Sequence, residues 1–160
     1  MVRKVFFSFH FDNDVFRVQQ IRNIGALQDN KPISTNEWET VKRGGDVAIK
    51  RWIDNTIKNC DCVVVLIGSE TANRPLVKYE IQRAWETGKG IFGIYIHNLR
   101  DPRTGKCLKG ANPFDNLLFT NGSRLSTKIK AYDPNPNDAY NDIRNGIGQC
   151  VEIAIRERNY

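Results

Sequence analysis

The chain has 160 residues, with 24 Lys or Arg against 18 Asp or Glu, so its formal net charge is +6. This length is typical of one domain with a single hydrophobic core, and we expect residues 1–160 to form one domain. The basic residues are scattered, which disfavours a nucleic-acid-binding stripe and indicates a solvated basic surface with a mild preference for anionic partners.

Four cysteines in a chain of this size do not indicate a secreted disulfide framework, and we interpret them as reduced thiols. Cys60 and Cys62 lack a second pair at zinc spacing, so no metal site is predicted. No leader precedes the first predicted strand, and no apolar run approaches the length of a membrane span. We therefore expect a soluble, cytoplasmic protein that binds neither membrane nor nucleic acid.

The N-terminal half predicts strand, helix, an ambiguous stretch and a second helix. An aromatic-rich strand is expected from Lys4 to Phe11, followed by a helix that Asp12-Asn13-Asp14 cap and that ends near Gly25. From Ala26 to Gly45, Ile33 hints at a short strand, while the capping-box spacing of Ser34 and Glu37 equally favours a short helix. After Gly44-Gly45-Asp46, a second helix is predicted as far as Cys60.

The C-terminal half continues the alternation. The apolar run Cys62–Ile67 predicts a buried strand, Pro75–Thr87 a helix closed by Gly88, and Gly90–His97 another buried strand. Residues 98–113 are too long for a tight turn and are either a lid or binding loop or a surface excursion. A helical turn at 114–119, an edge strand at 128–132 and a last helix from Ala139 complete the chain.

This alternation predicts a three-layer α/β fold, with a mostly parallel sheet of four or five strands and helices on both faces. We expect the flavodoxin-like strand order 2-1-3-4-5. In that order a crevice opens between the first strand and the Cys62 strand, at their C-terminal ends. The two loops beside it would be Phe11 to Asp14 and Gly68 to Arg74.

Several enzyme classes are disfavoured because their motifs are missing. The sequence has no Gly-x-Gly-x-x-Gly after a strand, no Walker Gly-Lys-Ser/Thr, no nucleophile elbow and no zinc-hydrolase His pair. A phosphate-sensing receiver could use Asp12 and Asp14 as an acidic pocket. It would also need an Asp at the end of its third strand, where Gly68 and Ser69 stand.

Glu80 is the candidate catalytic carboxylate. On a helical projection it lies about 85° from the centre of the apolar stripe, at its edge, where a carboxylate is partly desolvated and faces the crevice. The alternative is a boundary glutamate paired with Arg83 or Lys78. The histidines, His10 and His97, both end strands on one edge of the sheet, and either could bind a nucleotide or tolerate a half-buried position.

Three segments resemble the Toll/interleukin-1 receptor (TIR) domain, and more narrowly the TIR-like proteins of bacterial Thoeris antiphage systems. They are Val5-Phe6-Phe7-Ser8-Phe9-His10, Val63-Val64-Val65-Leu66-Ile67-Gly68-Ser69 and Val77-Lys78-Tyr79-Glu80-Ile81. The strand end Gly93-Ile94-Tyr95-Ile96-His97-Asn98 supports the narrower match. The resemblance covers residues 4–97 well and the remainder weakly.

The resemblance implies an enzyme that processes NAD as a substrate, so that nicotinamide leaves and the ADP-ribose part is hydrolysed or cyclised. Thoeris-type proteins are expected to make a cyclic ADP-ribose isomer that activates a partner effector. We expect neither a cofactor nor a metal. Glu80 would act at the nicotinamide ribose, where a carboxylate can stabilise an oxocarbenium-like state. TIR-TIR homo-oligomers are possible partners. The residues expected to line the NAD site are Ser8, His10, Phe11, Asp12, Ser69, Thr71 and Arg74.

The sequence departs from the family pattern at two places. Leu76 stands where many catalytic members carry Trp, and His10 and Phe11 replace the basic residues that commonly follow the first strand. Phosphate binding would then come from backbone amides, Arg74 or a neighbouring subunit. A non-catalytic module that binds another TIR domain through the same surface is the alternative function.

Overall fold

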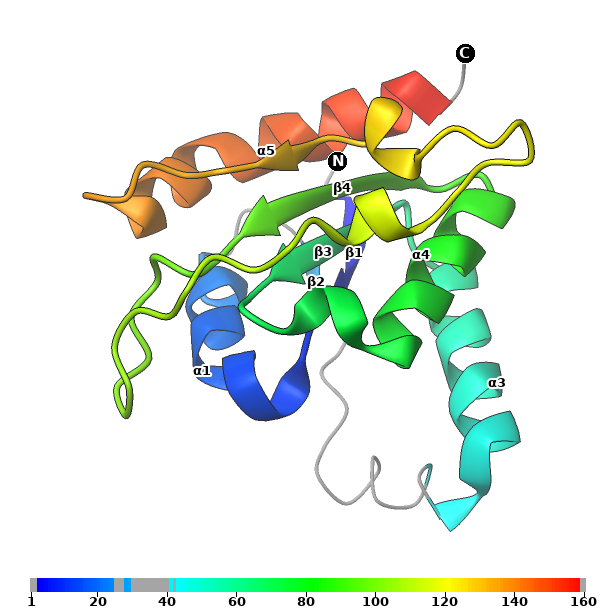
Figure 1. Ribbon diagram of the computed structural model, residues 1–160, viewed down its shortest axis with the longest axis horizontal. Helices are drawn as coiled ribbons and strands as arrows, with labels where there is room; N and C mark the ends of the chain where they lie inside the picture. The colour runs from blue at the N-terminus through cyan, green and yellow to red at the C-terminus, as the bar shows by residue number, and fades with distance from the viewer. Residues whose placement is uncertain (1–2, 25–27, 30–40, 42, 159–160) are drawn as a thin grey trace.

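The computed structural model describes residues 3–24, 28–29, 41 and 43–158, and a parallel sheet lies at its centre (Figure 1). The strand order is β2-β1-β3-β4-β5, and every described pair is parallel. This confirms the predicted order and the three-layer α/β class. The strands are β1 (Lys4–Ser8), β2 (Gln28–Asp29), β3 (Cys62–Ile67), β4 (Gly90–Tyr95) and β5 (Ala131–Tyr132).

Four described helices cover the two faces of the sheet. Helices α1 (Phe11–Arg22) and α5 (Ala139–Arg158) pack on one face, and α3 (Gly45–Lys58) and α4 (Pro75–Glu86) lie side by side on the other (Figure 1). Short 3-10 turns, η1 (Thr71–Asn73), η2 (Pro113–Asn116) and η3 (Leu125–Thr127), occur in the loops. Within the described ranges, no helix is both long and apolar enough to cross a membrane.

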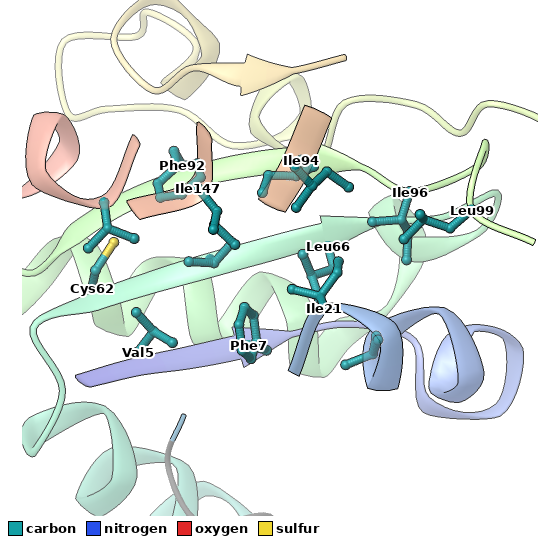
Figure 2. Close-up of a cluster of buried hydrophobic side chains, with 14 of the residues drawn as sticks. Val5, Phe7, Ile21, Cys62, Leu66, Phe92, Ile94, Ile96, Leu99 and Ile147 are labelled. Carbon is teal, nitrogen blue, oxygen red and sulfur yellow. The ribbon is translucent and has the colours of Figure 1, made fainter. Parts of the chain in front are cut away.

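Strand β3 is the centre of both cores because it is buried on its two faces. Its side chains alternate, as a strand requires. Cys62, Val64 and Leu66 point into the α1/α5 core, where Figure 2 shows Cys62 and Leu66 among residues of the neighbouring strands and helices. Val63, Val65 and Ile67 point into the α3/α4 core. A continuous apolar run is what a parallel strand covered on both sides needs.

The predicted boundary between the first strand and helix was wrong. Strand β1 ends at Ser8, and α1 begins at Phe11, so residues 11–14 form the first turn of a helix and not a loop. His10, and not Asp12-Asn13-Asp14, is the N-cap, since its Nδ1 accepts a hydrogen bond from the Asn13 backbone N–H at 3.3 Å. An imidazole nitrogen can replace the usual carboxylate or hydroxyl oxygen at this position.

The last strand is shorter than predicted. Only Ala131 and Tyr132 pair with β4, because the chain before them is still turning. The backbone N–H groups of Lys128 and Ile129 both donate to the Leu125 carbonyl. The predictions for Ile33, Ser34 and Glu37 concern positions outside the described residues.

Candidate active site

The candidate site lies at the C-terminal ends of β1 and β3, where the strand order reverses. Ser8 ends β1 opposite Val65 of β3. Beyond these strands, β1 leads into α1 through His10, and β3 leads into α4 through residues 68–74. Parallel sheets bind their ligands at this kind of junction, so the topology places the predicted residues of both segments at one crevice.

Glu80 lies in the second turn of α4 and is buried against the sheet. Its side chain is only 7% exposed, and it lies among Val77, Ile81 and Ala84 on the buried face of the helix. The Ser8 hydroxyl donates a hydrogen bond to Glu80 Oε1 at 3.2 Å, from strand to helix. The carboxylate is therefore inside the core, deeper than the edge position that the helical projection predicted.

The alternative in which Glu80 pairs with Arg83 was wrong. Arg83 instead forms ion pairs with Asp54 of α3 and with Glu86, each at 3.0 Å. No ion pair joins Glu80 to Lys78 among the described residues. The geometry thus removes the interpretation of Glu80 as an ordinary boundary glutamate.

Burial raises the pKa of Glu80 to about 8, and the hydrogen bond from Ser8 opposes that rise only in part. An ionised carboxylate loses its hydration in the core, and no described cation forms an ion pair with Glu80 to compensate. At neutral pH the side chain is therefore mostly protonated in the free protein. Carboxyl groups perturbed in this way cluster at functional sites.

Thr71 shapes the loop that follows β3. Its side chain is fully buried, and its Oγ1 accepts a hydrogen bond from the Gly68 backbone N–H at 2.8 Å. Ser69 is half-buried, and Arg74 is exposed at the N-cap of α4. Of the three residues predicted to bind substrate here, Ser69 and Arg74 can be reached from solvent, while Thr71 holds the loop from beneath.

The other side of the crevice is the first turn of α1. His10 is buried and caps this helix through Nδ1. Asn13 Nδ2 donates to Glu70 Oε2 at 2.8 Å, which joins α1 to the β3–α4 loop. Phe11 and Asp12 belong to this turn, but their side chains lie outside the described part of the structure.

A buried ion pair lies behind the site. Asp14 Oδ1 and Arg17 Nη1 are 2.9 Å apart, and both side chains are almost completely buried. Burial raises the pKa of Asp14, while the hydrogen bond from Arg17 lowers it. A phosphate-sensing receiver would use Asp12 and Asp14 as its acidic pocket. Because Asp14 is paired with Arg17, it is not available for that role. Among the described residues, no cluster of His, Cys, Asp and Glu is suited to hold a metal ion.

His97 follows the C-terminal end of β4, at the edge of the sheet that carries the candidate site. Asn98 Nδ2 lies 3.1 Å from its Nε2, and burial lowers the pKa of the imidazole. Its Nδ1 is buried without a hydrogen-bond partner. Of the two alternatives for His97, nucleotide binding and toleration of a half-buried position at a strand end, this environment fits the second.

Sequence reasoning missed Arg17 and the link between Asn13 and Glu70. The (i, i+3) spacing of Asp14 and Arg17 on one helix was a usable signal for the ion pair. No sequence pattern could have paired Asn13 with Glu70, which are 57 residues apart and meet only because β1 and β3 are neighbours.

Comparison of the sequence with known proteins identifies relatives of this chain. Residues 6–101 match the family described as "Thoeris protein ThsB, TIR-like domain". A relative from Bacillus cereus (strain MSX-D12), "Putative cyclic ADP-D-ribose synthase ThsB1", is 39% identical over 124 residues. That match covers 74% of this chain and 65% of the relative, so the chain spans just under two thirds of the relative's length. Both Ser8 and Glu80 lie within the matched family segment.

Proposed function

The chain belongs to the TIR-like domain family of the Thoeris protein ThsB, and on that premise we propose that it cleaves the nicotinamide N-glycosidic bond of NAD. In this proposal the ADP-ribose part closes into a cyclic product, which serves as the signal for a partner effector in antiphage defence. The observation that carries the proposal is the buried carboxyl group of Glu80, held by Ser8 at the C-terminal ends of β1 and β3.

Cleavage of this bond builds positive charge on the ribose ring, because nicotinamide departs as a neutral molecule and leaves an oxocarbenium-like centre. An ionised carboxylate near that centre stabilises it most strongly where water is excluded. Glu80 is in such an environment, since its side chain is 7% exposed and no described cation competes for it. It can also accept hydrogen bonds from ribose hydroxyls and orient the ring.

Binding of NAD would itself favour the ionised form of the Glu80 carboxyl group. The free protein keeps Glu80 protonated because burial raises its pKa to about 8. The nicotinamide ring of NAD carries a positive charge, and an opposite charge within a few ångströms lowers the pKa of a carboxyl group. Bound NAD would therefore favour loss of the Glu80 proton at the moment when the ionised form is needed.

The remaining predicted contacts belong to the same proposal. Ser69, Arg74 and His10 would bind the substrate from the two sides of the crevice, with Phe11 and Asp12 from the first turn of α1. Ser8 and Thr71 are engaged with Glu80 and Gly68, so they would act on the substrate through those residues. Assembly into TIR-TIR oligomers would add any phosphate contact that this chain lacks.

The test is incubation of the purified protein with NAD, followed by chromatography and mass spectrometry of the products. Glu80→Gln should lower nicotinamide release by roughly 10²–10³-fold, the range seen when one preorganised electrostatic group is removed. Glu86→Gln is the matched control, because Glu86 is an exposed glutamate on the same helix.

Nicotinamide release that survives Glu80→Gln unchanged would remove Glu80 from the mechanism. If the folded protein shows no turnover, while another TIR domain binds the wild type and Glu80→Gln equally well, the alternative of an interaction module replaces the enzyme.

A further inference from the structure

The segment of residues 98–110, which we term the roof segment, is fixed to α1 at its base. Leu99 is buried in the α1/α5 core beside Ile96 (Figure 2). Arg17 Nε donates to the Leu99 carbonyl at 2.9 Å, and Arg17 Nη2 donates to the Gly105 carbonyl at 2.8 Å. Gln20 adds a third link, to the Arg100 carbonyl at 2.8 Å. The segment is therefore anchored to α1 at its base.

Arg17 can form these links because its guanidinium group offers five N–H donors in one plane. Besides the two carbonyls of the roof segment, it donates to Asp14 Oδ1 at 2.9 Å and to the Asn13 carbonyl at 3.2 Å. The side chain is 2% exposed, and its hydrogen bonds to the Leu99 carbonyl and to Asp14 are buried. A lysine could keep the charge near Asp14 but could not reach several acceptors in one plane.

Further along, the roof segment lies directly on the loop that follows β3. A Cβ atom at Gly110 would be 2.0 Å from the Gly68 carbonyl oxygen and 3.0 Å from that of Ser69. Gly110 does not have a positive φ, so the requirement for glycine here is one of space alone. Gly68 also faces α1, because a Cβ atom on it would be 2.1 Å from Asp14 Oδ2. Helix α1, the end of β3 and the roof segment therefore meet at Gly68.

We propose that Arg17 and Gly110 are specificity-determining residues, which hold the roof segment on the Gly68–Ser69 loop so that water is kept from the cleaved intermediate and ring closure prevails over hydrolysis. This inference rests on the proposed NAD cleavage. Figure 1 shows the segment returning from beside α1 across the end of the sheet that carries the site. Arg17 and Gly110 need not contact the substrate, since both act by fixing the backbone of the roof segment.

The two outcomes differ in the nucleophile that attacks the ribose carbon once the bond to nicotinamide has broken. Attack by an atom of the ADP-ribose part itself gives a cyclic product, nicotinamide and one proton. Attack by water gives linear ADP-ribose, nicotinamide and one proton. Both reactions release the same nicotinamide, so the ratio of linear to cyclic product measures water access separately from cleavage.

The experiment compares Gly110→Ala with Gly148→Ala, since a Cβ atom at Gly148 in α5 would meet nothing within 4 Å. Gly110→Ala should raise the ratio of linear to cyclic product by about tenfold, while total nicotinamide release at saturating NAD changes by less than about threefold. Gly148→Ala should leave the ratio unchanged. Arg17→Lys should shift it in the same direction as Gly110→Ala.

Trapping of the intermediate by methanol in the wild type tests water access even if the variants fail to fold. Methanol added to the reaction should give almost no methyl ADP-ribose, because a closed roof excludes small nucleophiles as it excludes water. Efficient trapping by methanol, or folded Gly110→Ala with an unchanged product ratio, would overturn the role of the roof segment while cleavage stands. A wild type that releases no nicotinamide would overturn the proposed function, and this inference with it.

Discussion

The Ser8 hydroxyl donates to Glu80 Oε1 at 3.2 Å and thereby joins the end of β1 to the second turn of α4. Ser8 is fully buried and Glu80 is 7% exposed, so this hydrogen bond lies in a water-poor environment. The pKa of Glu80 depends on it in a definite direction, because the bond favours the ionised form while burial favours the neutral one.

The first prediction concerns the pH dependence of NAD cleavage. Ionised Glu80 is the active form, and its pKa in the free protein is about 8, so kcat/KM should rise with pH and level off above that value. The corresponding rise in kcat should occur at lower pH, since bound nicotinamide is cationic. Initial rates of nicotinamide release from about pH 6 to about pH 9 measure both. A flat kcat/KM profile over that range would contradict ionisation of Glu80 as the controlling step.

The second prediction is that Ser8→Ala moves the acidic limb of kcat/KM to higher pH. Removing the hydroxyl takes away the one described hydrogen bond that stabilises the ionised carboxylate, so the pKa of Glu80 rises further. At neutral pH the variant should therefore lose activity that it regains in part at alkaline pH. Loss by the same factor at every pH would indicate that Ser8 contributes only to packing.

The same pair can be measured without turnover. A double-mutant cycle of Ser8→Ala and Glu80→Ala in urea unfolding should give a coupling free energy of roughly 1.5–3 kcal/mol above the pKa of Glu80, where the hydrogen bond is to a charged group. Below that pKa the coupling should fall toward about 1 kcal/mol, because both partners are then neutral.

The third prediction concerns stability. Between its unperturbed pKa of 4.5 and its pKa of about 8 in the folded protein, Glu80 stays protonated when folded and ionises when unfolded. The unfolded state then binds fewer protons, so the free energy of unfolding should fall as pH rises through this window, by at most about 1.4 kcal/mol per pH unit.

Glu80→Gln should remove this slope and be more stable than the wild type near the upper end of the window, as measured by urea denaturation at several pH values. Glu86→Gln should keep the slope, since Glu86 is exposed and paired with Arg83. An equal slope in the wild type and in Glu80→Gln would show that Glu80 titrates normally in the folded protein.

The fourth prediction is that Thr71→Val lowers the free energy of unfolding by about 1–3 kcal/mol, because the buried Gly68 N–H loses its acceptor. The loop over the site should also shift, which raises KM more than it lowers kcat. Thr127→Val provides the comparison, since Thr127 lies on the surface in η3 and its hydroxyl donates to the Arg124 carbonyl. Equal losses of stability in the two variants would contradict a special role for Thr71.

The sequence by itself determined the alternation of strands and helices and the central strand–loop–helix. A continuous apolar run at 62–67 has to be covered on both faces, and Pro75 and Gly88 mark the start and the end of the next helix. Such signals are local in the sequence, so they can be recognised without knowledge of the rest of the fold. The resemblance that singled out Glu80 rests on the same segments.

Tertiary structure alone decided how deep Glu80 lies, what it contacts and what covers the site. Its hydrogen bond to Ser8 spans 72 residues, and the contact of Gly110 with Gly68 joins two loops that no periodicity connects. A helical projection gives an angle around one helix, but burial depends on the sheet and the loops that pack against it. The perturbed pKa, and with it the proposed chemistry, follows from that packing.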